Sequence, residues 1–412
     1  MAVVRPFRAV RPAPDKVAQV ASLPYDVMDS AEARKYVEGN PYSFMRIDRA
    51  EVNLPEGADL YAQSTYETAA NLLTEQRRAG VYVKDAKPCY YVYKQVMDGR
   101  AQVGVVGCAG VDDYLNNIVK KHELTLAKKE DDRCNHVDFL DANTGPIFLT
   151  YKARPDIDAV VARAMKSTPV YDFMGGNDVQ QTCWIIDNDA DIETIRAAFE
   201  ATPALYIADG HHRCASAVRV ARKRRCQNPD YTGQEEFNFF LCVLFPDEQL
   251  KILDYNRVVM DLNGLSEEQF LAKVGEKFDI APLSARPQSL AQHTFGMYLG
   301  GKWRLLTAKP GSFDGADVVA ALDVSILQQN LLTPILNIGD PRTDKRIDFV
   351  GGIRGLGELE KRVNDGAAVA FAMCPTAISE LMDIANAGRI MPPKSTWFEP
   401  KLLSGVFIHD LK

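Results

Sequence analysis

Hydrophobic and polar positions follow two spacings along the chain, one typical of strands and one typical of helices. Residues 60–76 place apolar side chains at helical spacing and predict an amphipathic helix. Residues 89–97 and 102–111 alternate on either side of Asp98-Gly99, which predicts a hairpin. The same spacings predict strands over 3–10, 146–151, 182–186, 204–207 and 405–408. They predict helices over 30–37, 157–165, 190–200, 266–278, 323–336, 357–363 and 376–387. A second hairpin is predicted to join 237–245 to 250–258 across Pro246-Asp247, and a third to turn at Gly300-Gly301 within 296–306. This mixture favours an α/β fold of the mixed α+β kind over a regular doubly wound sheet.

The length of the chain indicates more than one compact domain. A chain of 412 residues exceeds a single average core. The pattern of elements shifts after Leu262, although no Pro-, Gly- or Ser-rich linker marks the place. We therefore expect two domains, residues 1–260 and residues 261–412.

One polar cluster stands where a predicted strand is followed by a predicted helix. The apolar run 204–207 leads into Asp209-Gly210-His211-His212-Arg213, and residues 214–220 suit a helix. A helix N-terminus has unpaired N–H groups and a partial positive charge, so it favours anions. Gly210 allows close approach of a ligand to the backbone, and Arg213 offers a planar fork for phosphate. The cluster predicts a phosphate site in which Asp209 holds a metal ion or accepts a proton; the alternative is an N-cap aspartate beside histidines that only pack or face solvent.

A second polar segment, residues 120–133, combines acidic, basic and hydroxyl groups between apolar elements. Glu123, next to His122, could serve as a general base. Lys121 and Arg133 could neutralise phosphates. The alternative is a solvated charged loop, which is what most charge runs form.

The third candidate segment, residues 391–401, lies near the C-terminus. Prolines at 392, 393 and 400 stiffen it as a loop that also holds two aromatic residues. Its candidate ligand-binding residues are Lys394, Ser395, Thr396 and Lys401. An ordered loop of this composition suits a nucleotide base and its phosphates, and the alternative is a rigid tie that packs the C-terminus onto the body of the protein.

Composition narrows the classes of function. The formal net charge of −7 argues against a generic nucleic-acid binder, and the isolated basic run 222–225 is expected to form the solvated end of the helix begun at His211. None of the eight cysteines has C-x-x-C spacing, so we expect reduced core residues. The sequence shows no signal-peptide pattern and no apolar stretch near the ~20 residues that span a membrane. We expect a cytoplasmic protein without a membrane or nucleic-acid partner.

Together the three segments resemble those of a widespread bacterial family of unknown function, DUF1015. The resemblance rests on residues 206–213, on residues 121–125 with Asp132-Arg133, and on residues 391–401. It begins at Arg5-Pro6-Phe7 and runs nearly end to end. The Asp-Gly-His-His-Arg motif of residues 209–213 is also similar to that of the free serine kinases in the ParB/sulfiredoxin superfamily.

The resemblance to the serine kinases implies a ParB/sulfiredoxin-like core within residues 1–260, with large N- and C-terminal elaborations. It implies phosphorylation of L-serine with ADP or ATP and Mg²⁺, with nucleotide phosphates at the N-terminus of the helix after the motif. An upstream glutamate acts as base in those kinases, and Glu123 is its best match here. The chain departs from the kinases in its greater length, in the long separation of Glu123 from Asp209, and in residues 391–401, which have no counterpart that we can assign.

We therefore expect an enzyme, a phosphotransferase that acts on a small hydroxylated metabolite and most directly a free L-serine kinase. Glu123 and Asp209 would be catalytic, with Asp209 also a Mg²⁺ ligand. The expected phosphate- or nucleotide-binding residues are Lys121, His122, Gly210, His211, His212, Arg213, Lys394, Ser395, Thr396 and Lys401. The alternatives are a phosphoserine phosphatase or phosphotransferase that works in the reverse direction, and a non-enzymatic ParB-like nucleotide-binding switch.

Overall fold

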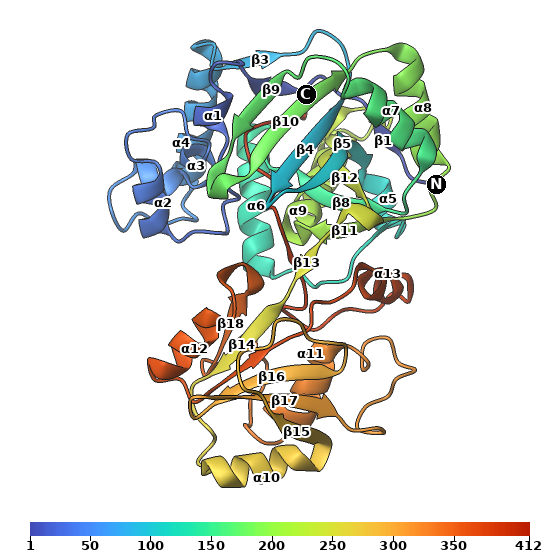
Figure 1. The fold of residues 1–412 in the computed structure, drawn as a ribbon. Helices are drawn as coiled ribbons and strands as arrows, with labels where there is room; N and C mark the ends of the chain where they lie inside the picture. Colours follow the sequence, from blue (N-terminus) through green and yellow to red (C-terminus); the bar gives the residue numbers. More distant parts are fainter. The chain divides into compact units, whose positions relative to one another are not determined.

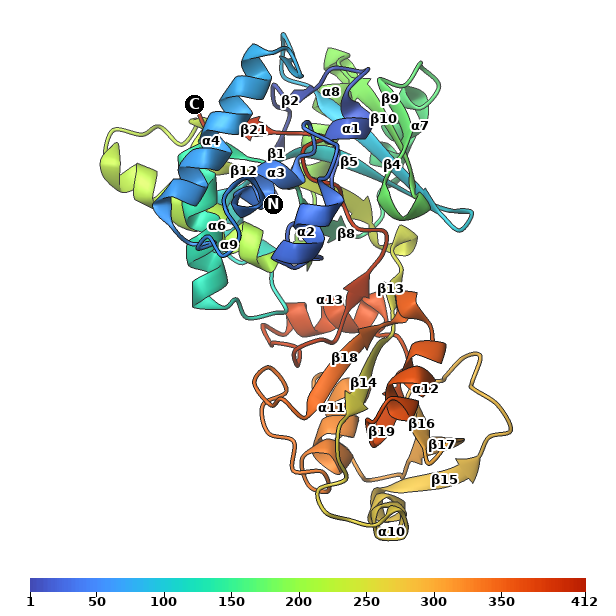
Figure 2. The same ribbon diagram turned by 90° about the vertical axis from the view of Figure 1, so that its left-hand side faces the viewer.

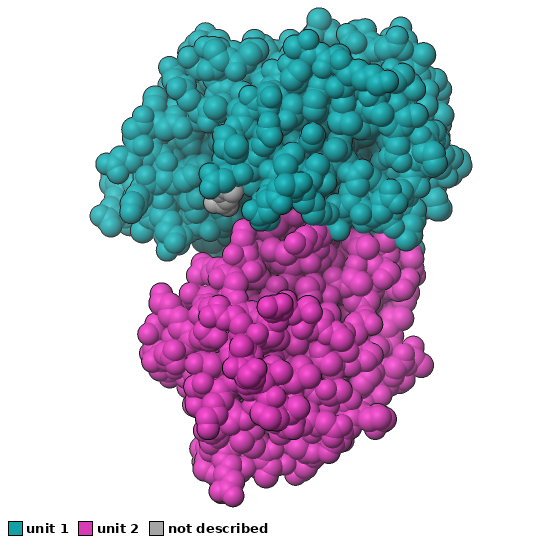
Figure 3. All heavy atoms as spheres, viewed as in Figure 1, with its two compact units in different colours: residues 1–250, 400–412 teal, residues 251–399 magenta. Residues whose placement is uncertain are grey.

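The structure, a computed structural model, describes residues 1–176 and 178–412 and divides into two compact units (Figure 1). Unit 1 comprises Met1–Leu250 and Pro400–Lys412, and unit 2 comprises Lys251–Glu399 (Figure 3). The sequence placed the division near residue 260 and assigned the whole C-terminus to the second domain. The chain instead returns to unit 1 at Pro400. Close to both passages, β13 (Ile252–Leu253) and β20 (Trp397–Phe398) pair as antiparallel strands within unit 2.

Unit 1 is built on a mixed sheet in the order β6-β11-β8-β12-β5-β4-β10-β9, with β1 paired to β5. Its strands are β1 (Val4–Arg5), β4 (Tyr90–Met97), β5 (Arg100–Gly110), β6 (Val119–Lys120), β8 (Ile147–Tyr151), β9 (Tyr171–Met174), β10 (Gln180–Ile186), β11 (Leu205–Asp209) and β12 (Phe239–Pro246). Two smaller ladders join β2 (Val10–Pro12) to β3 (Tyr82–Lys84) and β7 (Ala142–Asn143) to β21 (His409–Asp410). Within the large sheet β11 runs parallel to β6, and β12 runs parallel to β8.

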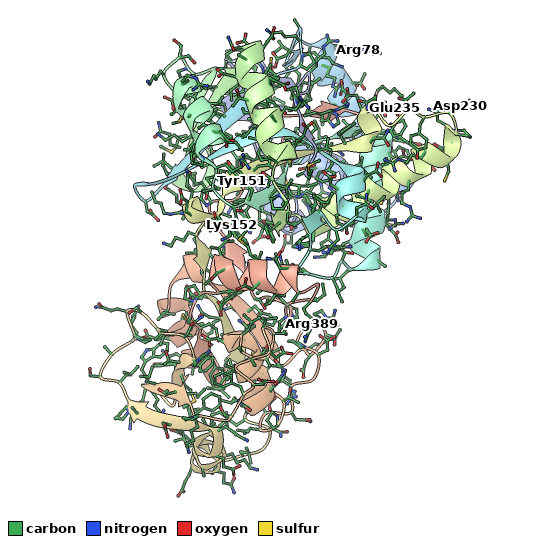
Figure 4. The ribbon with its side chains drawn as sticks, turned by 90° about the vertical axis from the view of Figure 1, so that its right-hand side faces the viewer. Arg78, Tyr151, Lys152, Asp230, Glu235 and Arg389 are labelled. Carbon is green, nitrogen blue, oxygen red and sulfur yellow. The ribbon has the colours of Figure 1, made fainter. Side chains whose placement is uncertain are left out.

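The helices of unit 1 pack around this sheet. They are α1 (Val17–Val20), α2 (Ser30–Tyr36), α3 (Met45–Asp48), α4 (Gln63–Arg78), α5 (Val111–Leu115), α6 (Ala127–Leu140), α7 (Pro155–Ala164), α8 (Asp189–Glu200) and α9 (His211–Gln227). Apolar residues of α7, α8 and α9 share one core cluster with alternate positions of β8 and β12. Helix α6 packs against both α9 and α4 (Figure 2). After α9 the chain turns through a loop that carries Asp230 and Glu235 (Figure 4).

Unit 2 has its own antiparallel sheet in the order β15-β17-β16-β19-β14-β18. The strands are β14 (Tyr255–Val259), β15 (Phe278–Pro282), β16 (Thr294–Leu299), β17 (Lys302–Ala308), β18 (Ile347–Gly351) and β19 (Val369–Ala372), and the helices are α10 (Glu267–Lys277), α11 (Asp323–Leu327), α12 (Gly357–Asn364) and α13 (Ile378–Asn386). Leu359 of α12 is buried in one cluster with Val258, Trp303 and Ala370 of the sheet. The presence of helices and largely antiparallel sheets in both units confirms the predicted mixed α+β class.

Several predicted elements are confirmed at the residue level. The hairpin of β4 and β5 turns at Asp98 and Gly99, whose φ angles of 52° and 76° are those that a two-residue hairpin turn requires. The hairpin of β16 and β17 turns at Gly300-Gly301. Helix α9 begins at His211, as the junction after residues 204–207 predicted.

Other predicted elements are wrong for identifiable reasons. Residues 237–245 and 250–258 form no hairpin, because β12 is buried along its whole length between β5 and β8 while β14 belongs to unit 2. The strand predicted over 3–10 is interrupted at Pro6, which has no N–H for a ladder. Of the strand predicted in the last ten residues, around 405–408, only the bridge from Ile408 to Val10 and the two residues of β21 form. Residues 127–133, for which a solvated loop was the alternative left open, form the first turns of α6.

No described helix is long and apolar enough to span a membrane.

Candidate functional site

A tight turn at Gly210 joins the end of β11 to the start of α9. Gly210 is the N-cap residue, and its φ of 91° lies in the left-handed region that favours glycine. A Cβ added there would lie 3.2 Å from Arg213 Nε. The turn therefore needs glycine both for its backbone angle and for the arginine that folds across it. The N-cap position is occupied by Gly210 rather than by Asp209, which was the alternative left open by the sequence.

Parallel pairing of β6 and β11 brings two distant segments of the sequence to the same edge of the sheet. Val119 and Lys120 lie opposite Leu205 and Tyr206. Because the strands run in the same direction, residues 121–123 leave the sheet beside Asp209, the last residue of β11. The backbone N–H of His122 lies 3.4 Å from His211 Nε2 and links the two segments directly.

Glu123 lies beside the first residue of α9. Its Oε2 is 3.9 Å from His211 Nδ1, and its side chain is 49% exposed. The N–H of His122 makes Nε2 of His211 an acceptor, which assigns the proton of the neutral ring to Nδ1, on the side of Glu123. Glu123 and the 209–213 turn, separated in sequence, thus share one neighbourhood in unit 1.

Two buried histidine rings form the floor of this neighbourhood. His122 and His211 meet edge to face with their centroids 4.4 Å apart. Burial lowers the pKa of His122 to about 4, against the opposing effects of Asp209 and the Ile207 carbonyl. Burial, and then His122, lower the pKa of His211 well below its ordinary value. Both rings are therefore neutral, and neither ring nitrogen of His122 has a hydrogen-bond partner of good geometry among the described residues.

Asp209 is held by a lysine from the C-terminal segment. Lys401 Nζ lies 3.0 Å from Asp209 Oδ2, while the Gly210 N–H donates to Oδ1 at 2.8 Å. Burial alone would raise the pKa of Asp209, but Lys401, Arg213 and these hydrogen bonds lower it below the ordinary value. The carboxylate is ionised at neutral pH. Gln95 fixes the lysine by donating to the Lys401 carbonyl at 2.9 Å.

Arg213 lies across the turn with part of its fork available. Its Nη1 donates to the Pro146 carbonyl at 2.7 Å, just before β8. Nothing in the sequence indicated this anchor, because the antiparallel pairing of β8 with β11 brings Pro146 to the site. Arg213 is half-buried. One nitrogen fixes the side chain, and the rest of the planar fork remains for an anion.

The remaining predicted residues lie in different places. Lys121 is exposed, with Nζ 4.4 Å from the centroid of the Tyr114 ring. His212 is half-buried, and its Nδ1 has no hydrogen-bond partner among the described residues. Lys394, Ser395 and Thr396 belong to unit 2, where Ser395 is buried and donates to the Pro392 carbonyl. A role for these three residues at nucleotide phosphates stays a prediction.

Asp209 is the candidate metal ligand that the sequence predicts. Within residues 1–176 and 178–412, no three His, Cys, Asp or Glu side chains are grouped as a metal site. Mg²⁺ is commonly bound by one or two carboxylates together with substrate phosphates and water. The ionised, partly exposed carboxylate of Asp209 fits that kind of binding, with phosphate oxygens as the other ligands.

The buried neutral histidines predict a loss of stability in mild acid. Burial lowers the pKa of both His122 and His136 to about 4. The unfolded chain binds a proton at each near pH 6.5, whereas the folded chain does so only near pH 4. The contribution of each neutral ring to the free energy of unfolding is therefore fully present above pH 6.5. It falls as the pH drops towards 4, by up to about 1.4 kcal/mol per pH unit for each histidine.

Urea unfolding at pH 7.5 and pH 5.5 measures this effect. The parent chain should be clearly less stable at pH 5.5, and His122→Gln should reduce the difference between the two values. Equal stability of the parent at both values would show that these rings are protonated in the folded chain.

Comparisons with known proteins give one family and several distant structures. The family described as "Protein of unknown function (DUF1015)" matches residues 4–325. No curated protein matches the chain. Solved structures similar to it include a free serine kinase variant in complex with AMP, at 13% identity, with 75% of this chain and 92% of that chain covered and a TM-score of 0.38. A conserved hypothetical protein from Pyrococcus furiosus is 13% identical, with coverages of 73% and 94% and a TM-score of 0.33. C-terminally truncated SbnI from Staphylococcus aureus is 11% identical, with coverages of 72% and 85% and a TM-score of 0.36.

Proposed function

The chain belongs to the DUF1015 family, which is described only as of unknown function, so we propose a function from the chain's own side chains. It is a phosphotransferase that moves a phosphoryl group from a nucleotide to the hydroxyl of a small metabolite. Free L-serine is the first candidate acceptor. The single observation that carries the proposal is the position of Glu123, 3.9 Å from the first residue of α9 and beside the 209–213 turn. A carboxylate base next to an anion-binding helix start is what transfer to a hydroxyl requires.

The N-terminus of α9 supplies the phosphate-binding part of the proposal. Its first N–H groups have no partners within the helix and face the end of β11, and the glycine turn leaves them open to a ligand. Arg213 adds a charged fork anchored at one nitrogen. Since His122 and His211 are neutral, each can donate or accept one hydrogen bond without bringing a further charge.

Glu123 accepts the proton of the acceptor hydroxyl as that oxygen bonds to the terminal phosphorus of the nucleotide. The bond from phosphorus to the bridging oxygen breaks, and the nucleotide leaves with one phosphate fewer. Neutral His211, with its proton on Nδ1, orients the carboxylate. Arg213 and the α9 N–H groups stabilise the charge that spreads over the transferred oxygens.

Asp209 and Lys401 complete the set. Asp209 would hold Mg²⁺, which when bound neutralises phosphate charge and aligns the donor. Lys401 contacts the Asp209 carboxylate and would also bind the nucleotide phosphates when they occupy the site. The similarity of residues 209–213 to the free serine kinase motif supports L-serine as acceptor, ADP or ATP as donor, and a ParB/sulfiredoxin-like core for unit 1.

The alternatives use parts of the same site. Reverse transfer from phosphoserine needs the same residues. A DNA-associated switch needs a basic face, but the basic run at the end of α9 is engaged: Lys223 and Arg224 pair with Asp138, and Arg225 pairs with Asp112. These ion pairs favour the enzyme over the switch.

Incubation of the full chain with Mg²⁺, each of ATP, ADP and pyrophosphate, and a panel of hydroxylated amino acids identifies donor and acceptor by mass spectrometry. We expect a phosphorylated amino acid, with L-serine the best acceptor. Nucleotide binding without any phosphorylated product would favour the switch.

Replacing Arg213 with Lys tests the phosphate site separately. Lysine keeps the charge but loses the planar fork and the anchor to Pro146, so nucleotide binding should weaken by about tenfold or more. Titration calorimetry with ADP measures it, and Arg219→Lys, an exposed arginine of the same helix paired with Glu130, is the control. Unchanged affinity in Arg213→Lys would show that Arg213 is structural.

A further inference from the structure

A polar cavity in unit 1 lies next to the 209–213 turn and is not used by the transfer step. Its volume is about 200 Å³, and it is formed by α3, α4, α6 and the segment around Tyr25. A smaller cavity of about 30 Å³ shares Tyr25, Asp48 and Arg133 with it and is also lined by Arg213. The two cavities are therefore adjacent, and the smaller one reaches the arginine of the proposed phosphate site.

Arg133 lines both cavities, and only one of its guanidinium nitrogens is hydrogen-bonded to a described residue. Its side chain is only 9% exposed, and Nε donates to Asp132 at 2.9 Å. Its guanidinium carbon lies 4.0 Å from the centroid of the Tyr25 ring, which fixes its plane. Neither Nη1 nor Nη2 has a hydrogen-bond partner among the described residues. Two adjacent unpartnered N–H donors on a buried, fixed arginine are a receptor for a carboxylate or a phosphate.

Asp48 lines the same two cavities with the opposite charge. Its side chain is 5% exposed; Thr144 Oγ1 donates a long hydrogen bond to Oδ1 at 3.5 Å, and His136 Nε2 lies 3.7 Å from Oδ1. His136 donates instead to the Ile47 carbonyl at 3.2 Å. Burial keeps the His136 ring neutral, so the ring brings no positive charge to Asp48.

Arg133 and Asp48 attract each other electrostatically but form no direct ion pair. Of the ion pairs within the described residues, that of Arg133 is with Asp132, and no nitrogen of Arg133 lies within 4.0 Å of Asp48. A buried carboxylate without a direct ion pair, and buried N–H donors without acceptors, are costly unless a ligand supplies the partners. The missing partner must bring an anionic group for Arg133 and a cationic group for Asp48, separated by a short distance.

We propose that this cavity binds the acceptor as a free α-amino acid zwitterion, with its carboxylate on Nη1 and Nη2 of Arg133 and its ammonium on Asp48. This inference rests on the proposed function for the identity of the amino acid as L-serine. It explains why the cavity is smaller than a drug-sized pocket and why it continues to Arg213, towards which the serine hydroxyl would point. Tyr25, shared by both cavities, separates the amino-acid end from the phosphate end.

Calorimetry on the full chain without nucleotide tests the zwitterion directly. L-Serine should bind, and so should L-alanine, which lacks only the hydroxyl. Ethanolamine lacks the carboxylate and 3-hydroxypropionate lacks the ammonium, so each should bind at least about tenfold more weakly than L-serine. Equal binding of either truncated compound would overturn the proposal, as would displacement of L-serine by adenosine, which would place the nucleoside in this cavity. These results need no variant and do not depend on folding of a mutant.

Two substitutions test whether Asp48 and Arg133 bind the amino acid. Asp48→Asn and Arg133→Lys should each weaken L-serine binding by about tenfold or more and leave ADP binding within twofold. Arg11→Lys is the matched control, because Arg11 is also buried but its fork is paired with Asp85. L-Serine phosphorylation with an unchanged KM in both variants would overturn the amino-acid site and leave the proposed function standing. L-Serine binding that depends on both residues, with no phosphorylation by any donor, would uphold the site and overturn the proposed function.

Discussion

Glu123→Gln is expected to slow phosphoryl transfer to L-serine by about 10²–10⁴-fold while nucleotide binding stays near the parent value. Glutamine keeps the shape of the side chain and still places an oxygen near His211 Nδ1, but it cannot take the hydroxyl proton. The carboxylate lies beside the start of α9, and its 49% exposed side chain leaves it accessible to a substrate. Single-turnover rates with saturating nucleotide measure the chemical step, and calorimetry with ADP measures binding.

Glu193→Gln is the matched control for this substitution. Glu193 is an exposed glutamate of α8 that pairs with Arg196 on its own helix, so its replacement removes one negative charge from unit 1 outside the site. The control should retain the parent rate. A Glu123→Gln chain that turns over at the parent rate would assign Glu123 to a solvated loop, the alternative that the sequence left open.

Asp209→Asn should lower turnover by about 100-fold or more and remove its dependence on Mg²⁺ concentration. The carboxylate is ionised and contacts Lys401 at 3.0 Å, so the substitution removes the charge that would hold the cation and breaks the ion pair with the lysine. A loss of several kcal/mol of transition-state stabilisation corresponds to this change in rate. Initial rates measured against Mg²⁺ concentration give both quantities.

Asp138→Asn is the control for Asp209→Asn. Asp138 pairs with Lys223 at 2.6 Å, so its replacement also breaks a carboxylate–lysine pair, but between α6 and α9 on the surface. Turnover and Mg²⁺ dependence should match the parent. Unchanged Mg²⁺ dependence in Asp209→Asn would exclude this carboxylate as the metal ligand.

The elements with strong local signals were predictable from the sequence. The Asp98-Gly99 turn and the strand-to-helix junction at residues 207–211 follow from local chemistry, because glycine or aspartate at positive φ and an apolar run before a helix leave few other conformations. Long-range pairings were less predictable. Pro246-Asp247 resembled a hairpin turn, but β12 has partners on both sides within unit 1, and the chain leaves for unit 2 soon afterwards.

In the candidate site, too, local features were predictable from the sequence and long-range contacts were not. Residues 209–213 were recognisable because one junction concentrates their side chains. Their proximity to Glu123 depends on β6, which has only the two residues Val119 and Lys120 and therefore gives no periodic signal. Asp48 gave no signal at all, because it becomes a cavity residue only when α3 packs near α6. Residues 391–401 read as one loop, yet Lys401 lies in unit 1 and Lys394 in unit 2.

Phosphorus NMR of the full chain with Mg²⁺, L-serine and ATP or ADP tests the central claim, phosphoryl transfer to a free amino acid at the Glu123–Asp209 site, most directly. The claim predicts a growing O-phosphoserine resonance, matched by loss of the terminal phosphate of the nucleotide, and no such resonance over the same time with Glu123→Gln. Bound nucleotide that stays intact with L-serine and every other hydroxylated amino acid would contradict it.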